Sequence, residues 1–254
     1  MVNLRSLERE ASMFGSPLII AHRALTPGAI PNSVASVSSA IDAGADLVEL
    51  DVRLSLDRKP VLVHDAMLRH TTTGRGWVRL WPNFGLRRLR LLLDADHPIQ
   101  TLEEALEVQL SGAQLALHLK DRGALGPVLR RLHEAKAASR TWLWLERPGD
   151  VITATRRLPD LRVTLLRPKG WYPDEYPSYV AEAQWVGAAA ISLPAGVISQ
   201  EMVRTAHQHH LRVFTRIDEP QQAPPLSAIG VDGFITTDSR ATRLLLAHSG
   251  HLMQ

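Results

Sequence analysis

The sequence predicts an α/β protein, a (β/α)8 TIM barrel that is somewhat distorted and carries a small inserted cap segment. Two patterns predict this fold class. Short apolar runs that stop at a charged residue recur along the chain, and helical patterns separate most of them. Such runs are typical of strands buried on both faces of a parallel sheet, with covering helices between them. The length of 254 residues also suits one such barrel.

Nine segments of the chain have the pattern of a strand. They lie at residues 18–23, 47–51, 60–64, 115–119, 142–145, 161–166, 188–192, 211–215 and 233–236. One of them is surplus to an eight-stranded barrel. We expect the extra strand within residues 53–64, because Leu56-Asp57-Arg58-Lys59 resembles a hairpin turn and leaves no room for a helix. The barrel is therefore expected to be distorted there.

Capping signals mark the helices between these strands. The first helix is expected to have Asn32 or Ser33 as its N-cap and to end at Gly44. Another begins at Thr101, where the sequence Thr-Leu-Glu-Glu has the form of a capping box. Residues 124–136 have the periodicity of a further helix. Helices of this kind are what a parallel barrel needs as its outer layer.

Residues 66–98 do not follow the alternation of strands and helices. The segment holds three bulky apolar residues, Trp77, Trp81 and Phe84, followed by a stretch rich in arginine and leucine. A connection of this length is usually a functional excursion or a small cap. Two interpretations stay open, a structural flap over the barrel mouth and a specificity lid that touches the substrate. Because there is no internal repeat or linker, residues 1–254 are expected to form one domain with this insertion.

Composition narrows the chemistry that the chain can support. Cysteine is absent, so disulfides and thiol nucleophiles are excluded, and a metal would need carboxylate or imidazole ligands. The formal charge of +3 is spread along the chain, and we do not infer nucleic-acid binding from it. Residues 1–10 lack the pattern of a signal peptide, and no apolar run approaches the roughly 20 residues of a membrane span. A cytoplasmic protein without stable membrane insertion is therefore expected.

Two carboxylates lie at the end of the second strand pattern. Glu49 and Asp51 are two residues apart, so both side chains project from the same face of the strand. Two like charges in a barrel interior need a compensating proton or cation. A divalent metal provides this compensation, and oxygen ligands suit magnesium, calcium or manganese. The alternative is a structural pair held by arginine or lysine.

Histidines end two of the other apolar runs. His22 follows the first run and His64 follows the run Val61-Leu62-Val63. A single histidine at such a place is often a hydrogen-bonded core residue. Two of them beside an acidic pair favour catalysis, because imidazole transfers protons near neutral pH. Arg23, next to His22, adds a forked donor for a phosphate or carboxylate.

The strand at residues 115–119 contributes two more polar side chains. His118 and Lys120 share one face of this strand. Lys120 could bind a phosphate, or it could neutralise Glu49 or Asp51 structurally. Carboxylates for a metal, cations for phosphate oxygens and imidazoles for protons together suit a reaction on a phosphate ester.

These residues resemble the motifs of the glycerophosphodiester phosphodiesterase family. The resemblance runs in order from about residue 18 to residue 240. It rests on His22-Arg23-Ala24, Pro31-Asn32-Ser33-Val34, Gly44-Ala45-Asp46-Leu47-Val48-Glu49-Leu50-Asp51-Val52, Val61-Leu62-Val63-His64-Asp65, Leu68-Arg69-His70-Thr71-Thr72-Thr73-Gly74-Arg75-Gly76, Gln100-Thr101-Leu102-Glu103-Glu104, His118-Leu119-Lys120, Phe214-Thr215-Arg216-Ile217-Asp218 and Gly230-Val231-Asp232-Gly233-Phe234-Ile235-Thr236-Thr237-Asp238.

The resemblance implies a fold, a reaction and a set of roles. The family has a somewhat distorted (β/α)8 barrel and hydrolyses glycerophosphodiesters to glycerol 3-phosphate and an alcohol. It implies that Glu49 and Asp51 bind a divalent metal ion, Mg²⁺, Mn²⁺ or Ca²⁺. His22 and His64 would be general acid and base, and Arg23 and Lys120 would contact the phosphate of the substrate. Attack by water and attack by a neighbouring substrate hydroxyl through a cyclic phosphate both stay open.

The chain departs from the family pattern at two positions. Asn32 replaces the glutamate of a Pro-Glu-Asn-Thr motif, and His118 replaces the third metal-binding glutamate. Neutral imidazole removes a negative charge from the metal's ligands and favours manganese, zinc or another transition ion over calcium. Our hypothesis is that His118 is a metal ligand.

Two alternative functions follow from these departures and from the insertion. The chain could be a catalytically degenerate barrel that only binds phosphoesters, although it retains all four of His22, Glu49, Asp51 and His64. It could also be a lysophospholipase D-like enzyme that acts on lipid through the insertion. In each case the expected partner is a small phosphodiester, and the oligomeric state stays open. The cluster at residues 207–210, with three histidines, is interpreted as a solvated helix face without carboxylate neighbours.

Overall fold

A computed structural model describes residues 15–94, 96–167 and 171–251, and the strands in it form one closed parallel barrel with an extra strand. Each barrel strand is hydrogen-bonded to two neighbours in the order β1-β9-β8-β7-β6-β5-β4-β2, and β1 pairs with β2 to close the ring. The strands are β1 (Leu18–Ala21), β2 (Leu47–Leu54), β3 (Pro60–Leu62), β4 (Gln114–Leu119), β5 (Thr141–Leu145), β6 (Arg162–Leu166), β7 (Ala190–Pro194), β8 (Arg212–Arg216) and β9 (Gly233–Thr236). The predicted (β/α)8 fold is confirmed. The prediction for residues 1–10 lies outside the described residues.

The extra strand is the one that the sequence placed within residues 53–64. β3 pairs with β2 in antiparallel register, with Val52 opposite Leu62. Ser55 donates its backbone N–H to the Lys59 carbonyl at 3.1 Å, which closes the turn between the two strands. This hairpin leaves no room for a helix directly after β2. The chain continues from β3 into the long insertion instead.

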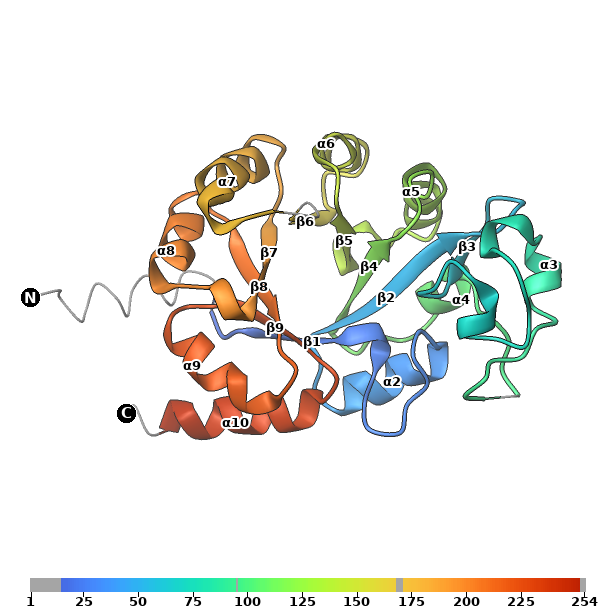
Figure 1. Ribbon diagram of the computed structural model, residues 1–254, viewed down its shortest axis with the longest axis horizontal. Helices are drawn as coiled ribbons and strands as arrows, with labels where there is room; N and C mark the ends of the chain where they lie inside the picture. Colours follow the sequence, from blue (N-terminus) through green and yellow to red (C-terminus); the bar gives the residue numbers. More distant parts are fainter. Residues whose placement is uncertain (1–14, 95, 168–170, 252–254) are drawn as a thin grey trace, which may run out of the picture.

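Helices surround the strands, as Figure 1 shows. They are α2 (Val34–Asp42), α3 (Asn83–Leu86), α4 (Leu102–Leu106), α5 (Leu125–Glu134), α6 (Pro148–Arg157), α7 (Tyr176–Trp185), α8 (Gln200–Gln208), α9 (Ala223–Ala228) and α10 (Ser239–His251). Ser33 caps α2 and Thr101 forms the expected capping box with Glu104. None of the helices in the described ranges combines the length and the apolarity that a bilayer crossing requires.

Two apolar clusters lie on the two faces of the barrel sheet. The larger cluster fills the space between the strands and the helices, and includes Val48 and Leu50 of β2. The smaller one fills the barrel interior, and includes Leu47 of β2 and Trp142 and Trp144 of β5. Because side chains alternate along a strand, the inward face of β2 continues from Leu47 to Glu49 and Asp51. The interior therefore changes from apolar to charged towards the carboxyl ends of the strands.

The insertion at residues 66–98 has a small core of its own beside β3. Its buried members include Val63, Leu68, Val78 and Leu86. Two of its three aromatic residues are largely outside this core, with Trp77 43% and Phe84 65% exposed. The insertion is thus an ordered cap that packs on the barrel at its own apolar face and presents other apolar side chains to solvent.

Candidate active site

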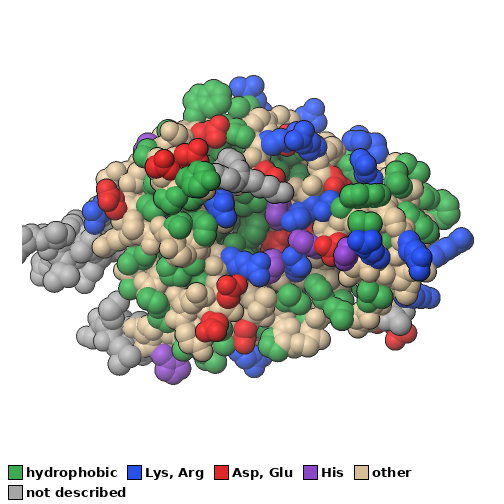
Figure 2. Space-filling model, in the orientation of Figure 1, with side chains coloured by type: hydrophobic (Ala, Val, Ile, Leu, Met, Phe, Trp, Pro, Cys, Tyr) green, Lys and Arg blue, Asp and Glu red, His purple; other side chains and the backbone are tan. Residues whose placement is uncertain are grey.

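All seven residues that the sequence predicted for the site lie at the carboxyl end of the barrel. His22 and Arg23 directly follow β1, Glu49 and Asp51 are on β2, His64 follows β3, His118 is on β4 and Lys120 follows it. Figure 2 shows histidine, basic and acidic side chains gathered around a hollow in this face of the molecule. The carboxyl end is where parallel barrels carry their chemistry.

The turn after β1 has an uncommon backbone. Arg23 and Ala24 both have positive φ values, 55° and 57°. Left-handed conformations cost energy for residues with a side chain and often occur at functional sites. Here the turn directs the Arg23 backbone N–H to the Glu49 Oε2 atom, 2.7 Å away. The Arg23 carbonyl accepts a hydrogen bond from the Asn32 N–H at 2.8 Å.

Asn32 holds Asp51 with two hydrogen bonds. Its Nδ2 donates to Asp51 Oδ2 at 3.1 Å, and its Oδ1 accepts from the Asp51 N–H at 2.8 Å. Asn32 has a φ of 58°, a conformation that asparagine tolerates better than most residues. The sequence had suggested it only as a helix cap and as a missing carboxylate. Its position shows a different local role, which is to orient one of the two acids.

The two carboxylates have opposite electrostatic environments. Burial, and then the charge of Asp51, raise the pKa of Glu49 to about 8. Burial alone would raise the pKa of Asp51 too, but the charge of Lys120 and the hydrogen bond from Asn32 bring it below its usual value. Without a further cation, Glu49 thus keeps a proton near neutral pH while Asp51 is ionised.

Two cationic side chains flank Asp51. Lys120 Nζ is 3.4 Å from Asp51 Oδ1, and Arg23 Nε is 3.3 Å from Asp51 Oδ2. The Arg23 Nε atom is buried, and its geometry does not make a hydrogen bond. The structural alternative for the acidic pair, neutralisation by arginine and lysine, therefore applies to Asp51. It does not apply to Glu49, whose Oε1 atom is buried without a hydrogen-bond partner.

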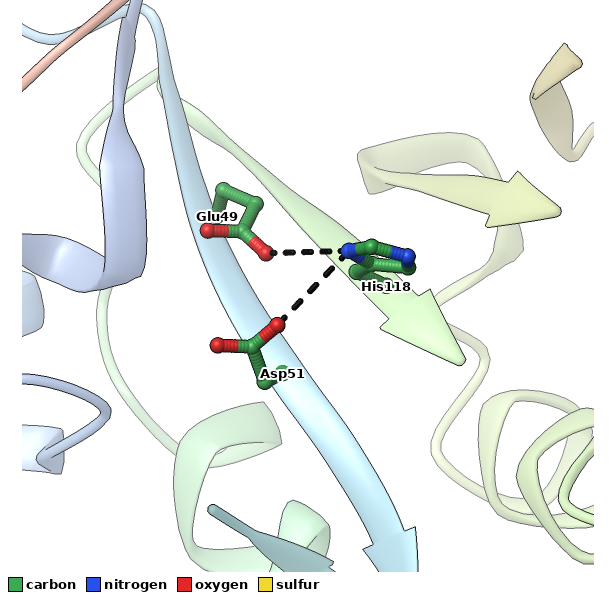
Figure 3. A group of neighbouring side chains, drawn as sticks. All are labelled: Glu49, Asp51 and His118. Atoms are coloured by element: carbon green, nitrogen blue, oxygen red, sulfur yellow. Dashed lines mark ion pairs between the residues drawn. The ribbon is translucent and has the colours of Figure 1, made fainter. Parts of the chain in front are cut away.

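Glu49, Asp51 and His118 form a group that could hold a metal ion (Figure 3). His118 Nδ1 is 3.9 Å from Glu49 Oε1 and 3.6 Å from Asp51 Oδ1. Ligands at about 2.1 Å from a six-coordinate ion are about 3 Å from their neighbours, so a small contraction would bring these three atoms into a coordination sphere. The unpartnered Glu49 Oε1 and the oxygen and nitrogen donors fit a divalent cation such as magnesium or manganese.

The two candidate proton-transfer histidines differ in their surroundings. Burial, then the charges of Arg23 and Arg216, lower the pKa of His22 to about 4, and its buried Nδ1 has no hydrogen-bond partner. His64 Nδ1 instead lies 3.0 Å from Asp65 Oδ1. The carbonyl of His64 accepts a hydrogen bond from Arg53 Nε at 2.8 Å. His22 is therefore neutral over most of the pH range, whereas His64 is positioned by its contact with Asp65.

Two cavities adjoin this centre. One, of about 300 Å³, lies between β3 and the insertion, and the other, of about 550 Å³, lies above β5 to β8. The first is lined by Arg23, Ile30, Pro31, Asn32, Leu62, Val63, His64, Asp65, His70, Thr71, Leu91, Leu92, Leu93, Pro98, Ile99 and Gln100. The second is lined by Glu146, Leu166, Arg167, Ser192, Leu193, Pro194, Ala195, Gly196, Arg216, Asp218 and Gln222. We call them the insertion cavity and the polar cavity.

Sequence reasoning missed several residues of this centre. Asp65 and Arg216 were quoted only as parts of motifs, and Trp144 was not singled out, although its ring lies 6.2 Å from that of His118. Strand alternation could have found Trp144 and Arg216, because both are in register with inward-facing neighbours. The partner of His64 could have been found from its adjacency to Asp65.

The interpretation of residues 207–210 as a solvated helix face is wrong for His207. This side chain is buried, and its Nε2 lies 2.8 Å from Asp232 Oδ2. The same carboxylate oxygen accepts the Val213 backbone N–H at 2.7 Å. His207 thus has a carboxylate neighbour that is distant in sequence. The pair joins α8 to the residue that directly precedes β9.

Comparison with known proteins places these features in a family. The model of the glycerophosphoryl diester phosphodiesterase family matches residues 22–240. A glycerophosphodiester phosphodiesterase of Bacillus altitudinis is 25% identical over 237 residues, covering 86% of this chain and 93% of the relative. One of Caldanaerobacter subterraneus subsp. tengcongensis is 37% identical over 75 residues, which is 30% of this chain and 30% of that relative's length.

A solved structure has the same fold. The Oleispira antarctica phosphodiesterase, in complex with the product sn-glycerol-3-phosphate, superposes with a TM-score of 0.79. The two chains are 23% identical, and the superposition covers 91% of this chain and 97% of the other. At this identity the likeness concerns the barrel architecture.

Proposed function

Because the chain belongs to the glycerophosphoryl diester phosphodiesterase family, we propose that it hydrolyses glycerophosphodiesters to glycerol 3-phosphate and an alcohol. The family is one of phosphoric diester hydrolases. The observation that carries the proposal is the group of Glu49, Asp51 and His118, with Arg23 and Lys120 beside Asp51. The product bound by the Oleispira relative supports glycerol 3-phosphate as the product here.

A divalent metal ion would be held by Glu49, Asp51 and His118. When bound, it would polarise a phosphoryl oxygen and neutralise charge that develops on the phosphate. It would also release the proton that burial keeps on Glu49. Imidazole in place of a third carboxylate favours manganese or another transition ion over calcium.

The two histidines divide the proton transfers. His22 is neutral and has a free buried nitrogen, so it accepts the proton of the attacking hydroxyl. His64, paired with Asp65, donates a proton to the alcohol oxygen as its bond to phosphorus breaks. One proton enters on His22 and one leaves from His64. With water as the nucleophile, this step gives glycerol 3-phosphate directly. With a neighbouring substrate hydroxyl it gives a cyclic phosphate, which water then opens while His64 accepts a proton and His22 returns one.

Arg23 and Lys120 would bind the non-bridging oxygens of the phosphate. In the structure both lie beside Asp51, at 3.3 Å and 3.4 Å. Before substrate binds, their positive charges partly neutralise the negative charge of Asp51. The phosphate would then replace Asp51 as the partner of Arg23 and Lys120. Asp51 would thereby become available as a metal ligand.

The test is release of glycerol 3-phosphate from a panel of diesters, after chelation and after addition of Mn²⁺, Mg²⁺ or Ca²⁺. We expect turnover that is lost on chelation and restored best by Mn²⁺. His118→Ala is expected to lower activity and change the order of the ions. His209→Ala is the matched control, because this partly exposed histidine on the helical side of the barrel contacts Gln184 and none of the site residues.

Equal activity of His118→Ala with every ion would contradict its role as a ligand. A protein that binds diesters in calorimetry without releasing glycerol 3-phosphate would be the degenerate binding barrel. Turnover unaffected by chelation would exclude the metal dependence while leaving the reaction in place.

A further inference from the structure

The insertion cavity is built differently from a site for a polar alcohol. Most of its wall is apolar, with contributions from the loop before α2, from β3, and from both ends of the insertion. The apolar wall residues are Ile30, Pro31, Leu62, Val63, Leu91, Leu92, Leu93, Pro98 and Ile99. Its volume of about 300 Å³ is at the lower end of the range for small-molecule sites.

Three polar side chains in this wall, Asp65, Thr71 and Gln100, bind other protein groups. Asp65 binds His64 through one oxygen and the Thr71 hydroxyl through the other, at 3.0 Å and 3.3 Å. Gln100 Oε1 accepts the Val34 backbone N–H at 2.5 Å. Arg23 and His64 also line the cavity, but the proposed mechanism assigns them to the phosphate and to the leaving oxygen. Beyond that oxygen, a ligand with several hydroxyls or a charge would lose hydrogen bonds to water against an apolar wall.

Two leucines at this cavity are unusually exposed. Leu92 is 57% and Leu93 is 74% exposed, yet both line the cavity. An apolar ligand that extended from the cavity would cover them. The insertion therefore places solvent-exposed apolar surface at the opening of the cavity, next to the candidate active site.

The cavity is continuous with the proposed site of the reaction. Arg23, Asn32 and His64 belong to both. His64 is the residue that donates a proton to the leaving alcohol in the proposed mechanism, so this alcohol must lie on the His64 side. The opposite, polar cavity offers Glu146, Arg167 and other polar groups, which suit the hydroxyls of a glycerol.

From this arrangement we propose that the insertion cavity binds the leaving alcohol and that the preferred alcohol has an apolar chain. The substrate class is then a glycerophosphodiester of a fatty or other aliphatic alcohol. The inference rests on the proposed function and adds to it the orientation and the chemical class of one half of the substrate. It differs from the lysophospholipase D-like alternative, in which the apolar chain is on the glycerol side.

The experiment compares kcat/KM for glycerol 3-phosphate esters of ethanol, butanol, hexanol and octanol, all used as monomers. Burial of one methylene group is expected to raise kcat/KM about fourfold, until the chain reaches the end of the cavity. Glycerophosphocholine tests a charged alcohol of similar size, and lysophosphatidylcholine tests an apolar chain on the other side. Both are expected to be poorer substrates than the octyl ester.

Variants locate the effect. Leu92→Asp and Leu93→Asp are expected to reduce the octyl-to-ethyl ratio of kcat/KM by at least tenfold, because a charge at the mouth opposes an apolar chain. Leu93→Met is expected to retain the ratio. The matched control is Leu244→Asp on α10, since Leu244 is 56% exposed and belongs to neither cavity.

Each outcome separates this inference from the proposed function. Release of glycerol 3-phosphate at the same kcat/KM from all four esters would overturn the inference and leave the proposed function intact. A preference for lysophosphatidylcholine would also overturn it. No release from any diester would overturn both, whereas a chain-length dependence abolished equally by Leu244→Asp would exclude the cavity as its cause.

Discussion

The insertion cavity and the polar cavity both lie at the carboxyl end of the barrel and differ in what their polar groups contact. On the insertion side, Asp65, Thr71 and Gln100 bind other protein groups and leave an apolar wall. On the other side, Arg167 and Arg216 are exposed at the ends of β6 and β8. Two halves of a barrel mouth with the same fold can thus be suited to opposite ends of one diester.

The difference originates in the connections after the strands. A hairpin follows β2 and leads into a long insertion, so apolar side chains from far along the sequence reach the mouth. After β8 the chain leads to α9 (Ala223–Ala228) without a long insertion, and the last inward residue of β8 is an arginine. The loops that follow the strands therefore determine which side chains line the barrel mouth.

The largest expected effects concern His22 and His64, the two residues proposed to transfer protons. His64→Ala and His22→Ala are each expected to lower kcat by about a hundred- to ten-thousand-fold, because each removes one proton transfer. With a p-nitrophenyl diester, whose leaving group needs no proton, the loss in His64→Ala is expected to shrink. The loss in His22→Ala is expected to persist. Steady-state kinetics with both substrates would measure this.

Equal losses with both substrates would contradict the division of roles between the histidines. Full activity of either variant would contradict its catalytic role. His209→Ala, which alters a partly exposed histidine that contacts Gln184, serves as the control in both assays.

Asn32 forms part of the insertion cavity and also holds Asp51, so it connects the cavity to the centre. Asn32→Ala is expected to lower the free energy of unfolding by about 2–3 kcal/mol. One part is the loss of a hydrogen bond to a charged group, and the other is the cost of alanine at a positive φ. Urea unfolding would measure it.

Asn83→Ala is the matched control for this change, because Asn83 is buried but its Oδ1 has no hydrogen-bond partner. A much smaller loss is expected there. Equal losses in the two variants would show that the hydrogen bonds between Asn32 and Asp51 contribute nothing particular to the free energy of unfolding.

The low pKa of His22 makes the stability of the protein depend on pH. The pKa is about 4 in the folded protein and near 6.5 in the unfolded chain, so the unfolded state binds more protons between these values. The free energy of unfolding of the metal-free protein is therefore expected to fall by about 2 kcal/mol from pH 7 to pH 5 through this residue. Urea unfolding of His22→Gln is expected to lack this part of the decrease.

An identical decrease in wild type and His22→Gln would contradict the burial of a neutral imidazole at this position. His209→Gln is expected to behave as wild type. Above pH 7, residue 22 is expected to cause no pH dependence of the free energy of unfolding in wild type or in either variant.

The smallest effect tests the charge of the polar cavity. Arg216 is one of the groups that lower the pKa of His22, after burial and Arg23. Arg216→Met is therefore expected to raise this pKa modestly, which NMR titration of the His22 ring would measure. Arg167→Met changes the same cavity without being among the groups that act on His22. Equal pKa changes in the two variants would refute the specific influence of Arg216.

Much of the fold follows from local patterns in the sequence. Apolar runs ending in charges are sufficient to locate the parallel strands, and the short link before Pro60 is sufficient to identify an antiparallel addition. The capping residues Ser33 and Thr101 mark helix starts because their side chains satisfy free backbone N–H groups. These signals act over a few residues and survive without tertiary context.

The parts of the site that could not be predicted depend on long-range packing. Asn32 contacts Asp51 because a left-handed turn folds back over β2, and no local pattern specifies that contact. His207 pairs with Asp232 although 25 residues separate them. The apolar wall at Leu91–Leu93 likewise depends on how the insertion packs against β3. Residue types identified the candidates, and the fold determined their partners.

The most direct test of the account is the location of Mn²⁺ in crystals of the protein by anomalous scattering. We predict one strong peak about 2.0–2.2 Å from Glu49, Asp51 and His118, with Lys120 moved away from Asp51. A structure in which Lys120 Nζ stays against Asp51 and no peak lies between the two carboxylates would contradict a metal-dependent centre at this end of the barrel.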